Sequence, residues 1–178
     1  PGYEIRFGGE AEERDRAVTN LLATAPVLVL VMFSVIVLSF GSFRAAFLIG
    51  GVGILSIGLG LFSLVVFGFP FGFMAIVGTM GLVGVAINDS IVVLAGLMAC
   101  PLARQGDVEA TTEVVLHSTR HIIATSLTTI AGFTPLLWQG GGFWPPLAIA
   151  IAGGVGGATI LALYFVPALF LISARLRP

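Results

Sequence analysis

The chain has 178 residues, of which 57% are hydrophobic and 10% are charged, and its mean hydropathy is +1.09. Soluble domains carry about a quarter charged residues, so this composition excludes an ordinary soluble protein and predicts a membrane protein. The formal net charge is −1 and lysine is absent, so no basic patch favours nucleic acid as a partner.

Residues 1–20 contain a cluster of acidic and basic side chains between Glu10 and Arg16. A segment of this kind is expected to lie in water, as a short strand over Tyr3–Phe7 followed by a turn and the polar start of a helix. The chain begins at Pro1 and shows no signal-peptide pattern, so we interpret it as a piece of a longer protein.

Five apolar segments follow, each close to the roughly 20 residues that a helix needs to cross a bilayer. The sequence therefore predicts an all-α fold, a polytopic bundle of five transmembrane helices. The expected helices are about 21–40, 45–67, 71–98, 122–138 and 145–172, within a transmembrane domain that covers residues 21–178.

The arginines of the connecting segments all fall on one side of the membrane if the five helices alternate in direction. They are Arg44, Arg104, Arg120, Arg175 and Arg177. Because cytoplasmic loops are enriched in arginine, we expect this side to face the cytoplasm, together with the polar segment 101–121. Part of that segment, from Val108 to Leu116, has the spacing of a surface helix.

The third apolar segment contains the sequence GVAINDSIVVL, and Asp89 within it is the only charged residue of the five expected helices. A buried ionised carboxylate is costly unless it is paired or can take up a proton. Carboxylates at membrane depth tend to mark proton relays, so Asp89, its neighbour Asn88 or both are candidate parts of an ion path. The alternative is that Asp89 only fixes the packing of helices through hydrogen bonds.

Small residues recur at helical spacing in the third and fifth segments. The positions are Gly78, Gly81 and Gly84 in the third segment and Gly153 and Gly157 in the fifth. Glycines at this spacing let two membrane helices approach closely, so we expect these five residues to lie at helix contacts.

Other polar residues admit simpler interpretations. Thr125 shares a helical face with Thr128 or Thr129, and threonine hydroxyls in membrane helices often bond to their own backbone. His117 and His121 are four residues apart but lack further ligands, so we interpret them as solvated side chains and expect no metal site. Cys100 is alone and is expected to pack as a small apolar residue.

Several motifs, taken in order, resemble those of one transporter family. They are GGEAEE, SFRAAFLI, GFPFGFMAIVGTMGLVGVAINDSIVVL, RHIIATSLTTIAGFTPLL and GGGFWPPLAIAIAGGVGGATILALYFVPALFLI. Together they resemble the C-terminal half of the proton-driven exporters of the resistance, nodulation and cell division (RND) superfamily. The resemblance covers nearly the whole chain and implies that residues 1–20 end a periplasmic porter domain. The five segments would then be helices eight to twelve of twelve.

The resemblance also implies a function and partners. Such proteins are multi-pass transporters of the bacterial inner membrane, not enzymes, and they export drugs, lipids or metal ions in exchange for protons. The coupling ion would be the proton, and no cofactor is expected. The expected partners are membrane lipid, the N-terminal half of the same transporter, two further copies in a homotrimer, and a periplasmic adaptor with an outer-membrane channel.

The resemblance implies roles for three residues. In drug exporters of the family, a lysine of the tenth helix pairs with two aspartates of the fourth helix. The matching position here is Asn88, followed by Asp89, so that ion pair cannot form. The proton is then carried by Asp89 or by a carboxylate of the N-terminal half. Thr125 matches a threonine of the relay on the eleventh helix.

Three alternatives to an exporter are open at this point. A membrane subunit that assists the Sec translocon in protein export also resembles an INDT-type membrane sequence. A purely structural membrane bundle would use Asp89 for packing alone. An intramembrane aspartyl protease would need two carboxylates that share a proton, whereas the expected helices contain only Asp89.

Overall fold

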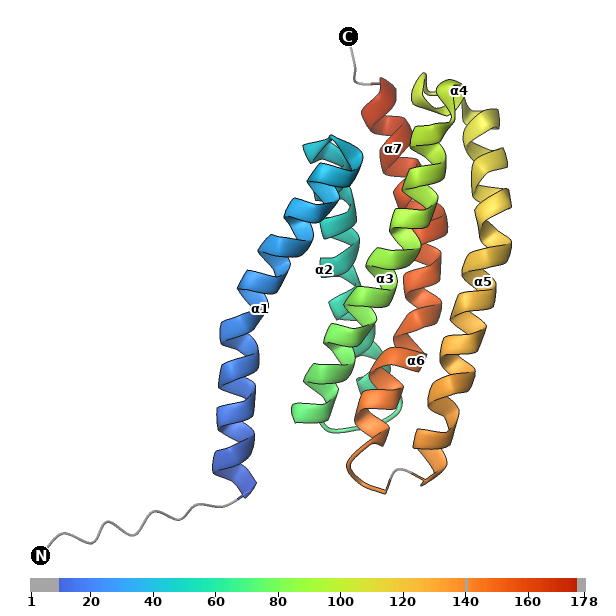
Figure 1. Cartoon of the computed structure of the whole chain (residues 1–178). Helices are drawn as coiled ribbons and strands as arrows, with labels where there is room; N and C mark the ends of the chain where they lie inside the picture. The colour runs from blue at the N-terminus through green and yellow to red at the C-terminus, as the bar shows by residue number, and fades with distance from the viewer. Residues whose placement is uncertain (1–9, 140, 176–178) are drawn as a thin grey trace, which may run out of the picture.

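The computed structural model describes residues 10–139 and 141–175, and the strand expected at residues 3–7 lies outside them. Every element of the described residues is helical (Figure 1). In chain order the elements are α1 (Glu10–Phe40), α2 (Phe43–Val66), α3 (Phe73–Ala99), α4 (Pro101–Arg104), α5 (Val108–Gln139), α6 (Pro145–Ile160), the π-helix η1 (Leu161–Phe165) and α7 (Val166–Arg175).

Five stretches of the described residues are long and apolar enough to cross a membrane, so the predicted fold class, an all-α bundle with five membrane helices, is confirmed. They are Arg14–Phe40, Phe43–Val66, Phe73–Ala99, Val108–Trp138 and Pro145–Ala174. The fourth begins earlier than the sequence indicated, because the expected surface helix continues without a break into α5. Asp107 caps α5 by accepting a hydrogen bond from the Ala110 N–H at 3.0 Å.

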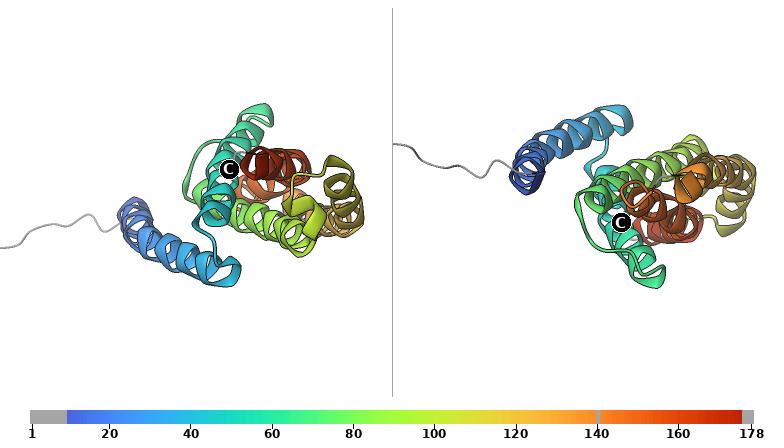
Figure 2. Two further views of the ribbon diagram at one scale, coloured as in Figure 1. Left: turned by 90° about the horizontal axis from the view of Figure 1, so that it is seen from above. Right: turned by 90° about the horizontal axis from the view of Figure 1, so that it is seen from below.

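The centre of the bundle is formed by α2, α3 and α6, with α5 packed against α6 and α3. Helix α1 leans away from this group, and both end views show it outside the bundle (Figure 2). Among the described side chains of α1 only Ile36 is buried, and Phe33 meets Phe47 of α2 edge to face at 5.3 Å. The connection between them turns at Gly41, whose φ of +58° is a left-handed conformation that suits glycine.

Glycine allows α6 to lie directly against its neighbours. A Cβ atom at Gly78 of α3 would lie 2.7 Å from the backbone oxygen of Leu147, and one at Gly157 would lie 2.8 Å from Leu59 of α2. A Cβ at Gly153 would lie 2.7 Å from the Cβ of Ser63. The close approach of α6 to both helices therefore depends on the absence of side chains at these positions.

The other two glycines that the sequence singled out lie in roomier places. A Cβ at Gly81 would lie 3.1 Å from the Cδ1 atom of Ile151, a flexible side chain. No atom lies within 4 Å of the corresponding position at Gly84, which is exposed. The surface of α3 at Gly84 itself is therefore not covered by another described helix.

Two hydrogen bonds connect helices through hydroxyl groups. The hydroxyl of Ser63 in α2 shares its hydrogen between the backbone oxygen of Gly60 in its own helix, at 2.8 Å, and that of Ile149 in α6, at 3.0 Å. The hydroxyls of Ser126 in α5 and Thr159 in α6 lie 2.6 Å apart. Hydroxyl pairs of this kind hold apolar helices in register, since the surrounding side chains supply only non-directional packing.

The last membrane-spanning rod is continuous from α6 through η1 to α7, and its π-helical part has a local cause. Pro167 cannot donate a backbone hydrogen bond, and its ring crowds the carbonyl group four residues earlier. The N–H of Val166 instead bonds to the oxygen of Leu161, five residues back, which widens the turn before the proline. The rod therefore bends without breaking.

The contact between α3 and α6 at Gly78 can be tested by adding one methyl group. Gly78→Ala should lower the free energy of unfolding by about 1–3 kcal/mol, because the added Cβ meets backbone atoms that cannot move independently. Gly156→Ala is the matched control, since its Cβ would meet no atom within 4 Å. Thermal unfolding in detergent measures both, and equal stability of the two variants would contradict the proposed close contact.

Candidate functional site

Asp89 lies on α3 in the buried part of the bundle. The residue is only 2% exposed, and apart from its immediate neighbours Asn88 and Ser90 the surrounding turns of α3 are apolar. The carboxyl oxygen Oδ2 is buried and accepts no hydrogen bond from any described residue. An acidic group is therefore held away from water with one of its two oxygen atoms unsatisfied, which is rare in folded proteins.

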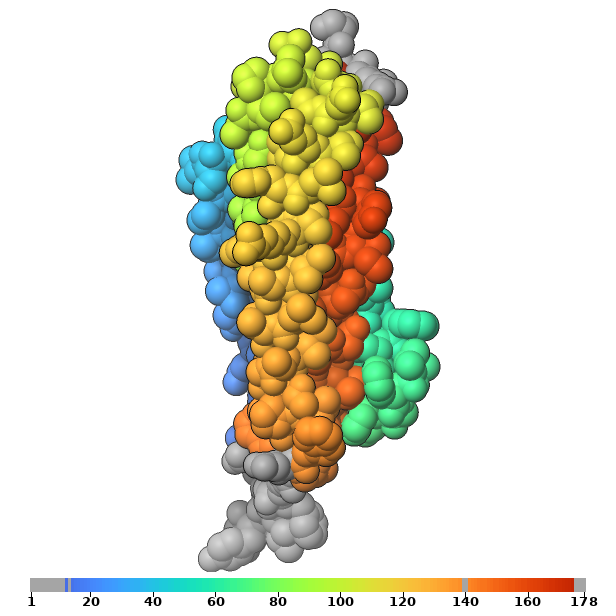
Figure 3. All heavy atoms as spheres, turned by 90° about the vertical axis from the view of Figure 1, so that its right-hand side faces the viewer, coloured from blue at the N-terminus to red at the C-terminus, as the bar shows by residue number. Residues whose placement is uncertain are grey.

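Helix α5 covers the side of α3 that carries Asp89. Gly96 of α3 lies against Val114 and Ser118 of α5, because a Cβ at Gly96 would lie 2.9 Å from the Cγ1 atom of Val114. The two helices run in opposite directions, so two turns back along α3 corresponds to two turns onward along α5 (Figure 1). This register places Thr125 opposite Asp89. In the space-filling view, α5 runs down the middle of this side, with α1 at one edge and the α6–α7 rod and part of α2 at the other (Figure 3).

The register of the two helices places His121 and Thr125 on the side of α5 that faces Asp89. They lie four residues apart and so share a face of α5. Thr125 is half-buried, and its hydroxyl donates to the backbone oxygen of Ile122 at 2.8 Å. His121 is exposed at the edge of the same face.

The structure brings Asp89 and Thr125 together but places Asn88 elsewhere. Asn88 is exposed on the face of α3 that also carries Gly81 and Gly84. One residue along a helix turns the side chain by about 100°, so Asn88 and Asp89 lie in adjacent sectors. Of the three residues predicted for the relay, Asn88 is therefore on an outer surface of this chain.

Sequence reasoning missed one residue of this site, His121, which it interpreted as a solvated side chain. The interpretation was correct about exposure, yet the register of α3 and α5 also brings His121 into the electrostatic environment of Asp89. The spacing from His121 to Thr125 was the available signal, because residues four apart in a helix face the same way.

The described residues contain no group of three or more His, Cys, Asp or Glu side chains that could hold a metal ion. The remaining acidic groups of residues 10–139 and 141–175 lie near the ends of α1 and α5, away from Asp89. The buried hydroxyl of Ser90 bonds to its own helix at the oxygen of Ala86, at 2.7 Å. The chemistry that this arrangement offers is the uptake, holding and release of a proton at one carboxyl group.

Comparison with known proteins places this geometry in a family. The profile of the AcrB/AcrD/AcrF family matches residues 1–174. The nickel and cobalt resistance protein CnrA of Cupriavidus metallidurans is 26% identical over 172 residues, which are 95% of this chain and 16% of that protein. The cobalt-zinc-cadmium resistance protein CzcA of the same organism is 28% identical over 180 residues, with 98% of this chain and 17% of that protein covered.

A multidrug resistance protein and a solved structure are also similar. MdtC of Escherichia coli is 33% identical over 129 residues, which cover 68% of this chain and 12% of MdtC. The crystal structure of a heavy metal efflux pump matches with a TM-score of 0.75 and 25% identity, over 96% of this chain and 18% of the pump.

The chain spans about a sixth of the length of the metal-resistance relatives that it matches. Its five long apolar helices and these relatives identify it as a multi-pass membrane protein. The family profile covers almost all of its residues. The chain therefore belongs to the AcrB/AcrD/AcrF family, in the RND superfamily of efflux transporters.

Proposed function

We propose that this chain is the C-terminal membrane half of a transporter that exports its substrate in exchange for protons. The observation that carries the proposal is the buried carboxyl group of Asp89, with its unsatisfied Oδ2 atom beside α5. The transporter lies in the bacterial inner membrane, uses the proton as coupling ion and needs no other cofactor. It moves its substrate without chemical change, so it is a secondary active transporter.

The mechanism is a change of charge at Asp89. An ionised carboxylate in a low-dielectric bundle attracts donors and cations, whereas a protonated one does not, so the helix arrangement of lowest free energy differs between the two states. One proton that crosses a potential of 100 mV supplies about 2.3 kcal/mol. This energy biases a two-state equilibrium roughly fiftyfold, which is enough to favour one conformation.

The hydroxyl of Thr125 connects the charge of Asp89 to the position of α5, because its hydrogen-bond partner depends on that charge. Its hydroxyl hydrogen now bonds to the oxygen of Ile122, within its own helix. An ionised Asp89 would compete for that hydrogen, since a charged acceptor forms the stronger bond. Exchange of one partner for the other couples proton release to a shift of α5 relative to α3.

The N-terminal half of the same transporter covers the exposed face of α3. Gly81, Gly84 and Asn88 are exposed along this face, and small residues there allow a further helix to approach. Asn88 then contributes an amide to the interface with that half. The assembled protein is a homotrimer that works with a periplasmic adaptor and an outer-membrane channel, as its family membership supports.

The comparisons favour metal cations as the exported substrate over drugs or lipids. The relatives that match over 95% to 98% of this chain are named for resistance to nickel, cobalt, zinc and cadmium. The similar solved structure is that of a heavy metal efflux pump. The multidrug resistance relative matches a shorter part of the chain, which keeps drug export as the second candidate.

Replacement of Asp89 tests the proton site. Asp89→Asn in the full-length transporter keeps the size of the side chain but cannot take up a proton. Efflux driven by a membrane potential of about 100 mV in proteoliposomes should lose the roughly fiftyfold bias that one proton supplies at that potential. Asp15→Asn, the same change at an exposed position of α1, is the control and should export normally. Full export by Asp89→Asn would reduce Asp89 to a packing residue.

Replacement of Thr125 tests the coupling step. Thr125→Val removes the hydroxyl that Asp89 would compete for, and export should fall by about tenfold, the effect of one hydrogen bond of roughly 1.4 kcal/mol. Thr128→Val is the control, because Thr128 is exposed and its hydroxyl bonds only to its own helix. Transport rates and proton uptake, measured with a pH-sensitive dye, should fall together for Thr125→Val alone. Similar loss in both variants would point to damage of α5 instead.

Growth of a bacterium that lacks its own exporters tests the substrate class. Expression of the full-length transporter should restore growth on Co²⁺, Zn²⁺ or Cd²⁺ and leave sensitivity to drugs unchanged, since the matches over nearly the whole chain are to metal-resistance proteins. Secretion of precursor proteins serves as the control and should not depend on this transporter. Protection against drugs alone would overturn the assignment to metals.

A further inference from the structure

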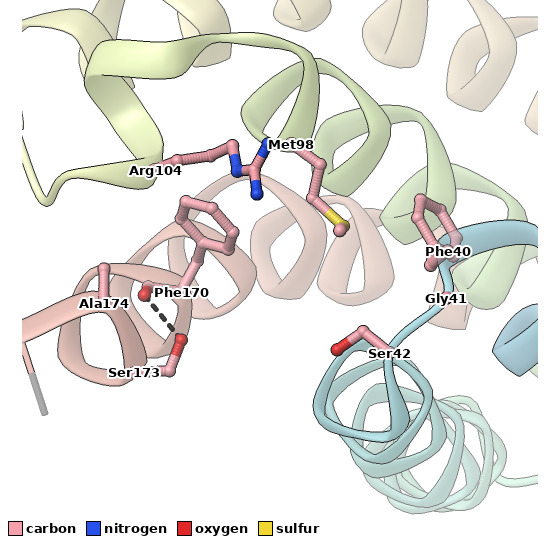
Figure 4. A pocket seen from close by; sticks show the side chains of 8 residues that line it. All are labelled: Phe40, Gly41, Ser42, Met98, Arg104, Phe170, Ser173 and Ala174. Atoms are coloured by element: carbon pink, nitrogen blue, oxygen red, sulfur yellow. Dashed lines mark hydrogen bonds between the residues drawn. The ribbon is translucent and has the colours of Figure 1, made fainter. Parts of the chain in front are cut away.

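A pair of adjoining pockets opens at the end of the bundle that carries Arg44 and Arg104. One has a volume of about 210 Å³ and lies between the α1–α2 turn, the end of α3, α4 and α7 (Figure 4). The second has a volume of about 180 Å³ and shares Ser42, Met98, Phe170 and Ser173 with the first. The two together extend from the end of the helices inward between α2, α3 and α7.

The polar groups of the two pockets are suited to an anion. Arg104 reaches over Met98 and Phe170 from α4, and the hydroxyl of Ser42 points into the same space (Figure 4). Arg44 lines the second pocket. Neither arginine forms an ion pair with a described residue, since the single salt bridge found there joins Arg16 and Glu12.

The two hydroxyls differ in what they can offer a ligand. Ser173 donates its hydrogen to the oxygen of Phe170 at 2.7 Å, so it retains only acceptor capacity. Ser42 instead accepts a hydrogen bond from the Ala45 N–H at 3.4 Å, which leaves its hydroxyl hydrogen available to an anion. Arg104 therefore lines the first pocket and Arg44 the second, and Ser42, which lines both, supplies one hydroxyl donor.

The inner walls are apolar. They are formed by Leu48, Leu94, Met98, Leu169 and Phe170. A free inorganic anion would gain nothing from these side chains, whereas a hydrocarbon chain would bury apolar surface against them. Each pocket is also smaller than the roughly 300–1,000 Å³ of sites that enclose a drug-sized molecule.

The depth of the pockets in the membrane suits a ligand that has an anionic head and a hydrocarbon chain. The membrane-spanning stretches of α1, α2 and α3 end or begin at Phe40, Phe43 and Ala99, directly beside the pockets. The level at which such helices end is that of the lipid headgroups. Basic pockets between membrane helices at this level bind anionic headgroups.

We propose that the adjoining pockets bind one anionic phospholipid, with its phosphate at Arg44, Arg104 and Ser42 and the start of an acyl chain against the apolar inner wall. The bound lipid joins the α1–α2 turn to α4 and α7, which are otherwise in little mutual contact. This site is separate from Asp89 and lies toward the end of the bundle. It goes beyond the proposed transport mechanism and does not depend on it.

Lipid retention by the full-length transporter tests the proposal. Native mass spectrometry of the detergent-purified protein should show retained phosphatidylglycerol in preference to phosphatidylcholine with the same acyl chains. The double variant Arg44→Gln/Arg104→Gln should weaken phosphatidylglycerol binding by about fivefold for each arginine removed. Arg120→Gln is the matched control, because this exposed arginine of α5 belongs to neither pocket and should bind as before.

A second variant tests whether the volume of the first pocket is needed when both arginines are intact. Ala174→Trp fills the first pocket and leaves both arginines intact, so loss of phosphatidylglycerol with a normal unfolding temperature is the expected result. Unchanged retention in the double arginine variant, or equal loss in Arg120→Gln, would overturn the site. Displacement of the lipid by inorganic phosphate would overturn the assignment to a phospholipid, since it would show an anion site that ignores the acyl chain. Asp89→Asn should retain the lipid, so failure of the transport mechanism stays distinguishable from failure of this site.

Discussion

The carboxyl group of Asp89, a residue only 2% exposed in an apolar bundle, is the constraint on how the surrounding helices pack. The side of α3 that carries Asp89 is covered by α5, and α3 also packs against α2 and α6. Its Oδ2 atom has no partner among the described residues, so the arrangement costs free energy that packing elsewhere in the bundle must offset. A bundle that served only as a membrane scaffold would lose nothing by having an apolar residue at this position.

The closest approaches between the helices of the bundle occur at small residues. Gly78 and Gly157 bring α6 against α3 and α2, and the hydroxyl pair of Ser126 and Thr159 joins α5 to α6. Shape and a few hydrogen bonds thus replace the hydrophobic effect, which supplies no driving force between helices in lipid. The neighbouring face of α3, at Gly84 and Asn88, is exposed, and this asymmetry matches a chain that is about a sixth of its relatives' length.

The fold class followed from the sequence because hydropathy measures what a membrane helix needs, a long apolar stretch without charge. Hydropathy placed the start of the membrane helix α5 too late in the chain. Polar residues such as Thr111 and Glu113 belong to the same helix, which begins at Val108. Asp89 was recognisable as the one charge at membrane depth. The exposure of Asn88 and the position of Thr125 opposite Asp89 were not, because both depend on helix rotation and register, which arise from contacts between segments distant in the sequence.

Infrared difference spectroscopy of the reconstituted full-length transporter tests most directly whether Asp89 takes up and releases a proton. A protonated carboxyl group absorbs separately from a carboxylate, so loading of the site gives a band of its own. The account predicts a protonated-carboxyl band that appears when the side supplying protons is acidified, changes when substrate is added, and is missing in Asp89→Asn. A band that persists in Asp89→Asn, or one that ignores both the proton gradient and the substrate, would contradict it.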